Sequence, residues 1–318
     1  LAHIKLAHIP NLTVVGITGS YGKSSTKDFI DYLIKEDFQT LKTPTNINTE
    51  IGIAKLILTK IKKHHQVLIL EMGALSQGEI RKMCKMAPPH ISVLTAVDSQ
   101  HLSLFGSLDN LAKAKSEILL YMRPDAKAFV NLDAPATKKS LKHVYSKSPL
   151  DMRIQTYGTH QKANHQIGDI QMKKNKLQFR LDKKSYKSQV YGVQFAHNLT
   201  ASILVAQALG LKHETIKERV SKLDNQLIST QLVKHPKGFY ILNDSYNSNP
   251  TGFLSALDNL NQTDNTKKKY LLSSGMFELG KKSSYYHRKV FKQAAKYCDV
   301  LILTKPHLQK YLPRNFKK

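Results

Sequence analysis

The sequence predicts an α/β protein: a P-loop ATPase domain built on a central, mostly parallel sheet, a small antiparallel β patch, and a truncated Rossmann-like α/β domain at the C-terminus. Apolar runs of strand type alternate with helical patterns from residue 12 to residue 131, and the alternation returns after residue 232. Strands that alternate with helices favour a parallel sheet with right-handed crossovers. A glycine-rich stretch over residues 16–26, between the first strand and the first helix, has the composition of a phosphate-binding loop.

The elements of the first part follow from these patterns in chain order. Apolar runs predict strands over residues 12–15, 66–70, 91–95 and 128–131, and helical spacing predicts helices over 27–34, 51–61 and 108–121. From 152 to 192 polar and apolar residues alternate, which is typical of antiparallel strands with one solvated face. His197 and Asn198 then open a helix over 199–209, which Gly210 ends.

The second part is expected to begin between residues 222 and 232. The same patterns predict strands over 239–242, 270–272 and 300–303 and helices over 252–260 and 286–296. These elements make a short second nucleotide-fold domain.

The glycine-rich stretch has the residues that phosphate binding requires. Gly19 and Gly22 precede Lys23 and Ser24 at the expected start of a helix. Glycines let backbone N–H groups turn toward a phosphate, the lysine reaches the outer phosphates, and the hydroxyl can bind Mg²⁺. Five residues separate Gly16 from Gly22, where the standard P-loop has four, so the loop is a variant. An ordinary βα turn is the alternative.

Glu71 directly follows the apolar run 66–70, at the expected carboxyl end of a strand. Open α/β sheets bind ligands at this edge, and a carboxylate there is well placed to hold the Mg²⁺ of a nucleotide. An exposed loop glutamate is the alternative.

Composition narrows the class of protein. The 318 residues, of which 41% are hydrophobic and 23% charged, suit about two globular domains. No apolar run reaches the 18 or so residues of a membrane span and no signal pattern begins the chain, so we expect a soluble, cytoplasmic protein. Cys84 and Cys298 are expected to be buried thiols. The net charge of +26 comes from short lysine runs spread along the chain, which favours a solvated surface over a nucleic-acid site.

Eight motifs, in order along the chain, resemble those of the Mur ligase family. They are residues 16–27; 42–50; 71–74 with 78–80; His101 with 105–107; Ala114, Lys115 and Glu117; His197 and Asn198; 244–250; and 276–280 with His287.

This resemblance implies a domain organisation and an activity. Residues 1–11 would be the remnant of an N-terminal domain that binds a UDP-sugar, 12–225 the central ATP-binding domain, and 226–318 an incomplete C-terminal domain. The implied activity is ATP-dependent amide bond formation in peptidoglycan precursor synthesis, joining D-alanyl-D-alanine to UDP-N-acetylmuramoyl-tripeptide through an acyl phosphate. The implied cofactors are ATP and Mg²⁺, the implied partners are the two peptide substrates, and we expect a monomer with no nucleic-acid partner and no membrane span.

The resemblance also assigns roles to residues. The implied catalytic residues are Lys23, His101 and Lys115, and the implied nucleotide contacts are Gly19, Ser20, Gly22, Lys23, Ser24, Ser25, Asn198, Asp244 and Asn247. The implied metal ligands are Ser24, Glu71, His101 and Lys115. An ammonium group has only donors, so Lys115 could serve a metal only after carbamylation, which the resemblance implies. Without the resemblance, Lys115 would be expected on the surface of its helix.

Three positions depart from the family pattern. Gln231 stands where an arginine is usual, and Asn243 and Gly275 stand where aspartates are usual. These departures keep open two alternatives: a nucleotide-binding protein of this kind without ligase activity, and a related ligase with another amino acid substrate. A basic nucleic-acid-binding protein ranks below both.

Overall fold

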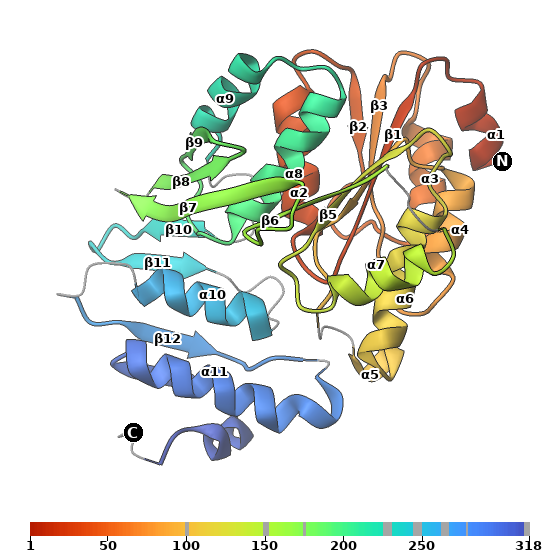
Figure 1. Cartoon of the computed structure of the whole chain (residues 1–318). Helices are drawn as coiled ribbons and strands as arrows, with labels where there is room; N and C mark the ends of the chain where they lie inside the picture. The colour runs from red at the N-terminus through yellow and green to blue at the C-terminus, as the bar shows by residue number, and fades with distance from the viewer. Residues whose placement is uncertain are drawn as a thin grey trace.

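A nine-stranded sheet forms the centre of the computed structural model, which describes residues 1–98, 102–148, 153–173, 176–224, 231–243, 250–261, 267–277 and 279–314. Within these residues the strand order is β2-β3-β1-β4-β5-β6-β7-β8-β9 (Figure 1). The strands are β1 (Thr13–Thr18), β2 (Thr40–Lys42), β3 (Val67–Glu71), β4 (Ile91–Leu94), β5 (Lys127–Asn131), β6 (Ile154–Gly158), β7 (His165–Lys173), β8 (Lys176–Leu181) and β9 (Lys184–Ser188). Neighbours from β2 to β7 pair in parallel, so the prediction of a mostly parallel sheet is confirmed.

Helices cover both faces of this sheet (Figure 1). One face packs against α1 (Ala2–Ala7), α3 (Glu50–Lys60), α4 (Glu79–Met86), α6 (Leu108–Leu120) and α7 (Thr137–Tyr145). The other face packs against α2 (Lys23–Ile34), α8 (Phe195–Ala208) and α9 (His213–Lys222). Leu68 and Leu70 of β3 belong to the first core, and Val67 and Ile69 belong to the second, which explains the continuous apolar run. Over the described residues, no helix combines the length and apolar character that crossing a bilayer requires.

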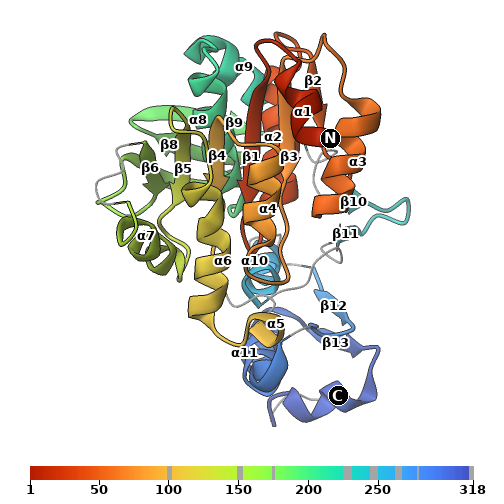
Figure 2. The ribbon, with the colours of Figure 1, turned by 90° about the vertical axis from the view of Figure 1, so that its right-hand side faces the viewer.

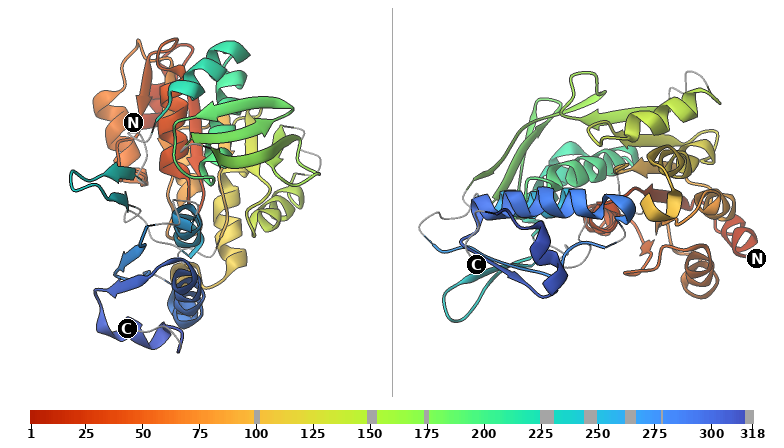
Figure 3. Two further views of the ribbon diagram at one scale, coloured as in Figure 1. Left: turned by 90° about the vertical axis from the view of Figure 1, so that its left-hand side faces the viewer. Right: turned by 90° about the horizontal axis from the view of Figure 1, so that it is seen from below.

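The predicted antiparallel patch is confirmed, and its strands continue the central sheet at one edge. β7, β8 and β9 pair antiparallel in sequence, and β6 joins β7 to the parallel strands. Figure 3 (left) shows these three strands in green at the edge of the sheet, and their apolar side chains share a core with helices α2, α8 and α9.

Helix α8 begins at Phe195, four residues before the predicted start, so His197 and Asn198 lie inside its first turn. The backbone N–H groups of Phe195 and Ala196 donate to the carbonyls of Gly192 and Val193, so a tight turn leads directly into the helix. Sequence analysis also missed short elements such as the strand β2 and the helices α4 and α7. Elements this short contain too few residues for a clear hydrophobic period.

The C-terminal unit lies below the central sheet in the view of Figure 2. Its elements are β10 (Gln231–Lys234), β11 (Tyr240–Asn243), α10 (Pro250–Asn261), β12 (Tyr270–Ser273), α11 (Ser283–Tyr297) and β13 (Val300–Leu303). β10 and β11 form an antiparallel pair, and β12 and β13 form a parallel pair. In the described part of the chain, the predicted strand at 239–242 pairs with β10 and not with β12 or β13, so the strands of this unit form two separate pairs.

Gly275, one of the departures from the family pattern, lies where a side chain has no room. Its φ is +82°, and a Cβ there would lie 2.9 Å from His287 Nε2 and 2.9 Å from Leu308 Cδ1. The His287 ring is 2% exposed, and its Nε2 accepts a hydrogen bond from the Met276 N–H at 3.0 Å. The histidine thus binds the turn after β12 to helix α11, and only glycine fits beside it.

Among the described residues, hydrogen bonds of Thr251 and Asn259 join α10 to the central unit. Asn259 Nδ2 donates to Gln194 Oε1 at 2.9 Å, the Tyr191 hydroxyl donates to the Asn259 carbonyl at 3.1 Å, and Thr251 Oγ1 donates to Asp98 Oδ2. The first turn of α10 therefore lies beside the carboxyl ends of the parallel strands.

Candidate functional site

The turn between β1 and α2 is the predicted glycine loop, but only its second half has a loop conformation. Gly16 lies within β1, where a Cβ would meet Pro89 Cγ at 2.8 Å. Gly19 has no room for a side chain because a Cβ would lie 2.1 Å from Thr95 Oγ1. Gly22 caps α2 with φ +80°, and a Cβ there would lie 2.6 Å from Asn198 Nδ2. The unusual spacing of the motif arises because Gly16 serves strand packing and not the loop.

The end of β4 fixes the position of the loop. Thr95 Oγ1 donates to the Tyr21 carbonyl at 2.6 Å. Ser20 Oγ donates to the Asp98 carbonyl and accepts from the Asp98 N–H, both at 3.0 Å. Ser20 is thus a structural contact of the loop and is 1% exposed. Since the Asp98 carboxylate accepts a hydrogen bond from Thr251, Asp98 also connects the loop to α10.

The start of α2 is held from the opposite side by α8. Asn198 Nδ2 donates to the Gly22 carbonyl at 2.7 Å and to Thr26 Oγ1 at 3.1 Å. Lys23 Nζ donates to the Gly19 carbonyl at 2.8 Å, and burial lowers its pKa against the opposing effect of Glu71. The first N–H groups of a helix have no partners within the helix and point along its axis, so this turn presents donors and a lysine together.

Glu71 ends β3 beside this turn and is 4% exposed. Its Oε2 accepts a hydrogen bond from Ser24 Oγ at 2.8 Å and lies 3.5 Å from Lys27 Nζ, while its Oε1 accepts one from Asn48 Nδ2 at 3.2 Å. Lys27 is 1% exposed, so a buried cation faces a buried carboxylate. The alternative of an exposed loop glutamate is wrong.

Lys115 of α6 lines a cavity together with Lys23, Ser24 and Glu71 and is 2% exposed, so the surface position expected from sequence alone is wrong. Burial lowers the pKa of Lys115 to about 7, and the charge of Lys23 acts in the same direction. The carboxylates of Glu79, Glu117 and Glu71 oppose this shift. Near neutral pH, Lys115 is therefore an uncharged amine in a substantial fraction of the protein molecules.

Glu117, one helical half-turn from Lys115, has a structural role. Its carboxylate accepts hydrogen bonds from the N–H groups of Gly78 at 2.6 Å and Arg81 at 2.9 Å. A carboxylate at a helix N-terminus satisfies donors that the helix leaves free. Glu117 therefore holds α4 against α6, on the helix that carries Lys115.

Sequence analysis missed a second polar group in the cavity. Asp133 follows β5; its Oδ2 lies 2.8 Å from His197 Nε2 and accepts hydrogen bonds from the N–H and hydroxyl of Thr159 at 2.6 and 2.9 Å. Burial raises the pKa of Asp133, but these hydrogen bonds outweigh burial and hold the pKa below its usual range. Burial together with Asp98 and Asp133 raises the pKa of Tyr21. The position of Asp133 at a strand end was the signal available in the sequence.

These groups surround a cavity of about 1400 Å³ to which both units contribute. Its lining includes Tyr21, Gly22, Lys23, Ser24, Ser25, Glu71, Lys115, Asp133, His197 and Asn198 from the central unit and Thr251 and Ser255 from α10. His101, Asp244 and Asn247, which the sequence placed here, lie outside the described residues. Among the residues that are described, no three His, Cys, Asp or Glu side chains gather closely enough to hold a metal by themselves.

Comparison with known families and proteins agrees with this geometry. Residues 17–206 match the family described as Mur ligase middle domain, and residues 230–316 match Mur ligase, glutamate ligase domain. The UDP-N-acetylmuramoyl-tripeptide--D-alanyl-D-alanine ligase of Bacillus subtilis is 28% identical over 278 residues, and that of Synechocystis is 29% identical over 289. These alignments cover 87% and 88% of this chain but only 59% and 58% of the relatives, so the chain spans about three-fifths of their length.

Solved structures show the same fold. The MurF ligase from Thermotoga maritima in complex with ADP superposes with a TM-score of 0.84 at 27% identity and covers 98% of this chain and 71% of its own. A structure of MurF from Acinetobacter baumannii has a TM-score of 0.82 at 24% identity, with 95% and 65% covered.

The pair of Glu71 and Lys27 yields a prediction about stability. Glu71→Gln leaves the buried Lys27 ammonium without a carboxylate, so we expect the free energy of unfolding to fall by about 3 kcal/mol. Urea unfolding followed by far-ultraviolet circular dichroism measures the change. The double variant Glu71→Gln/Lys27→Met is expected to recover most of the loss, and a single variant as stable as the wild type would contradict the role of the pair.

Burial of Lys115 predicts that the folding stability depends on pH. The folded protein releases this proton near pH 7, whereas the unfolded chain holds it up to about pH 10.4. The cost of burying the charge is therefore complete below pH 7 and disappears as pH rises toward 10. Lys115→Met is expected to unfold at higher urea concentration than the wild type below pH 7, in carbonate-free buffer, with a gap that narrows at alkaline pH. A gap that is constant from pH 6 to 10 would contradict the assignment.

Proposed function

The chain belongs to the Mur ligase family, and on that premise we propose that it is an ATP-dependent ligase that joins D-alanyl-D-alanine to UDP-N-acetylmuramoyl-tripeptide. The observation that carries the proposal is the group formed by Lys23, Ser24, Glu71 and Lys115 around the glycine loop, at the edge of the cavity. The relatives that carry this activity in their names support the choice of substrates.

Nucleotide binding is the first part of the proposal. The N–H groups at the start of α2 and the ammonium of Lys23 would receive the phosphates, and Gly22 and Ser25 line the approach. Asn198, Asp244 and Asn247 are proposed as contacts of the adenosine, with Asn198 placed beside Gly22 by its hydrogen bond. The Thermotoga maritima relative, solved in complex with ADP, supports a nucleotide in this position.

The residues present fit a magnesium ion. Mg²⁺ prefers oxygen ligands and keeps several waters, and the Ser24 hydroxyl and Glu71 carboxylate place two such ligands 2.8 Å apart. We propose these two as ligands of the ion that accompanies ATP, with Glu71, His101 and carbamylated Lys115 serving a second ion. Bound there, the ions would neutralise phosphate charge. Lys27 would then balance the Glu71 carboxylate from the side of the helix.

Carbamylation of Lys115 is supported by its chemistry. An uncharged amine can add CO₂ and lose a proton, which turns a donor into a carboxylate-like acceptor, and a pKa near 7 makes that amine available at neutral pH. The neighbouring Lys23 ammonium would stabilise the resulting anion, which burial alone would disfavour.

The reaction assigns each group a task. The substrate carboxylate takes the γ-phosphoryl group of ATP to form an acyl phosphate, and the amine of D-alanyl-D-alanine displaces phosphate to form the amide. Lys23 and the α2 N–H groups stabilise the charge that develops on the phosphoryl oxygens. Because α10 lines the same cavity, docking of the C-terminal unit would bring the reactants together and exclude water. The proposed setting is the cytoplasm, and the proposed working unit is a monomer.

Nucleotide binding can be tested directly. Isothermal calorimetry of Mg-ATP with the wild type is expected to show binding, and Lys23→Ala is expected to weaken it at least tenfold because a charge-assisted hydrogen bond is lost. Lys142→Ala, which removes an exposed lysine from α7, serves as the control with unchanged affinity. A folded wild type that does not bind Mg-ATP would refute the proposal.

A phosphate-release assay distinguishes the ligase from the alternative functions. If the natural full-length protein binds Mg-ATP but releases no phosphate in the presence of the UDP-linked tripeptide and D-alanyl-D-alanine, the nucleotide-binding protein without ligase activity is the correct function. Phosphate release with another amino acid in place of D-alanyl-D-alanine would instead identify the related ligase.

Carbamylation has a spectroscopic test. Protein equilibrated with ¹³C-bicarbonate at pH 8 is expected to show one protected carbamate resonance, which Lys115→Met abolishes. Lys113→Met, an exposed lysine two residues earlier on the same helix, is expected to leave the resonance unchanged. A resonance that persists in Lys115→Met would assign the group to another amine.

A further inference from the structure

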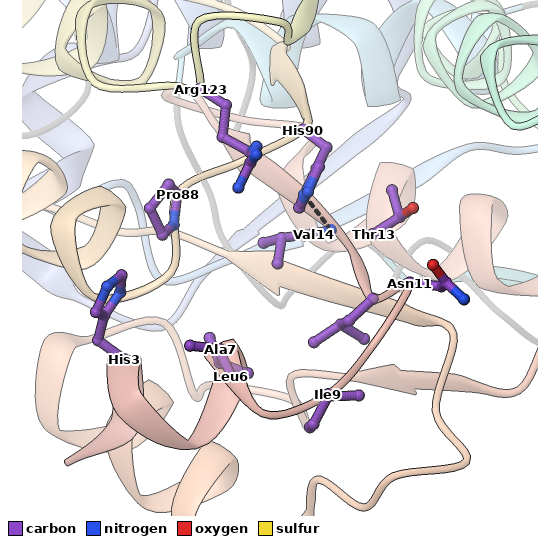
Figure 4. Close-up of a pocket in the computed structure, with 11 residues that line it drawn as sticks. His3, Leu6, Ala7, Ile9, Asn11, Thr13, Val14, Pro88, His90 and Arg123 are labelled. Carbon is purple, nitrogen blue, oxygen red and sulfur yellow. Dashed lines mark hydrogen bonds between the residues drawn. The ribbon is translucent and has the colours of Figure 1, made fainter.

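A second cavity, of about 680 Å³, lies at the opposite end of β1 from the glycine loop. It is enclosed by α1, the segment that leads into β1, the segment before β4, and Arg123 after α6 (Figure 4). The six residues of β1 separate it from the loop by about 20 Å. Its volume is in the range of small-molecule sites, and the nucleotide chemistry makes no use of it.

One side of this cavity carries a permanent cation. Arg123 extends toward His90 in Figure 4, and its side chain is 45% exposed. Its Nε donates to Asp125 Oδ1 at 3.2 Å, which uses one of the five donors of the guanidinium. Its backbone N–H donates to the Pro89 carbonyl at 3.0 Å, so the rim that carries the cation is fixed to the segment before β4.

His90 supplies a donor whose tautomer is set by the backbone. The backbone N–H of His90 donates to the Val14 carbonyl at 2.8 Å. The ring Nδ1 accepts from the Val14 N–H at 3.0 Å (Figure 4). Because Nδ1 is the acceptor, the neutral ring carries its proton on Nε2. Burial and the Arg123 charge lower the pKa of His90, which agrees with a neutral ring.

The remaining lining is mainly apolar. Ile9 and Val14 are 7% and 3% exposed, and Leu6 and Pro88 lie beside them (Figure 4). On the far side the His3 ring is oriented by a hydrogen bond between its Nδ1 and the Met86 carbonyl at 3.2 Å. An anionic head group at Arg123 and His90 would thus place its hydrocarbon part on an apolar floor.

We propose that this cavity is a binding site for a small organic monoanion, a carboxylate with a short branched aliphatic chain, held by the Arg123 guanidinium and the His90 Nε2–H. A carboxylate matches the planar fork of an arginine; the Asp125 carboxylate pairs with Arg123 through Nε, and the terminal N–H groups of the guanidinium are the donors proposed for the ligand. The donors are held in place before the ligand arrives, so little ordering opposes binding. The site is separate from the nucleotide cavity and does not depend on the proposed ligase activity.

The test uses isovalerate as the probe and isovaleramide as its neutral, isosteric control. Calorimetry with the full chain is expected to show binding of isovalerate, at least tenfold weaker binding of isovaleramide, and at least tenfold weaker binding of isovalerate to Arg123→Gln. Arg180→Gln, which removes an equally exposed arginine from β8, is expected to bind isovalerate as the wild type does. The His90 ring resonances are expected to shift on titration.

Three results would overturn the proposal. Absence of isovalerate binding to the folded wild type would show that the cavity is not an anion site, and equal affinity of Arg123→Gln would exclude the assigned head-group contact. Displacement of isovalerate by saturating Mg-ADP would place the probe in the nucleotide cavity. Equal affinity with and without Mg-ADP is the expected outcome, whether or not the chain is a ligase.

Discussion

The buried carboxylate of Glu71 is the group on which the arrangement of the site depends. A carboxylate that is 4% exposed must be paired and hydrogen-bonded, and its partners come from separate segments: Ser24 and Lys27 from α2, and Asn48 from the loop before α3. Its own N–H donates to Thr43 Oγ1 at 3.0 Å. Satisfying one charge therefore fixes the loop, the helix start and the strand end relative to one another.

Whereas the contacts of Glu71 stabilise the site, the burial of Lys115 lowers stability. Its burial disfavours the charged form and lowers the folding stability below pH 7, yet the same burial produces an uncharged amine within the cavity. A residue kept at such a cost is typical of functional sites. Glu117 adds rigidity nearby by holding the N-terminus of α4 with two backbone hydrogen bonds.

The connection between the two units also passes through the site. Ser20 of the loop is bound to the Asp98 backbone, and the Asp98 carboxylate accepts a hydrogen bond from Thr251 of α10. Asn259 adds contacts with Gln194 and Tyr191. The same hydrogen bonds therefore connect the loop to the C-terminal unit, and residues of both units line the cavity.

Elements whose signals are local could be predicted from the amino-acid sequence. Alternating apolar runs gave the parallel strands, and the glycines before Lys23 gave the loop, because backbone freedom and burial act over a few residues. The position of Gly16 within the strand, the contact of Ser20 with Asp98, and the burial of Lys115 in the cavity that Glu71 also lines are seen only in the folded structure. The folded structure also shows that β7, β8 and β9 belong to the central sheet, and that Asp133 contacts His197, 64 positions away in the sequence. Such contacts depend on charges and packing between distant segments, which no local pattern records.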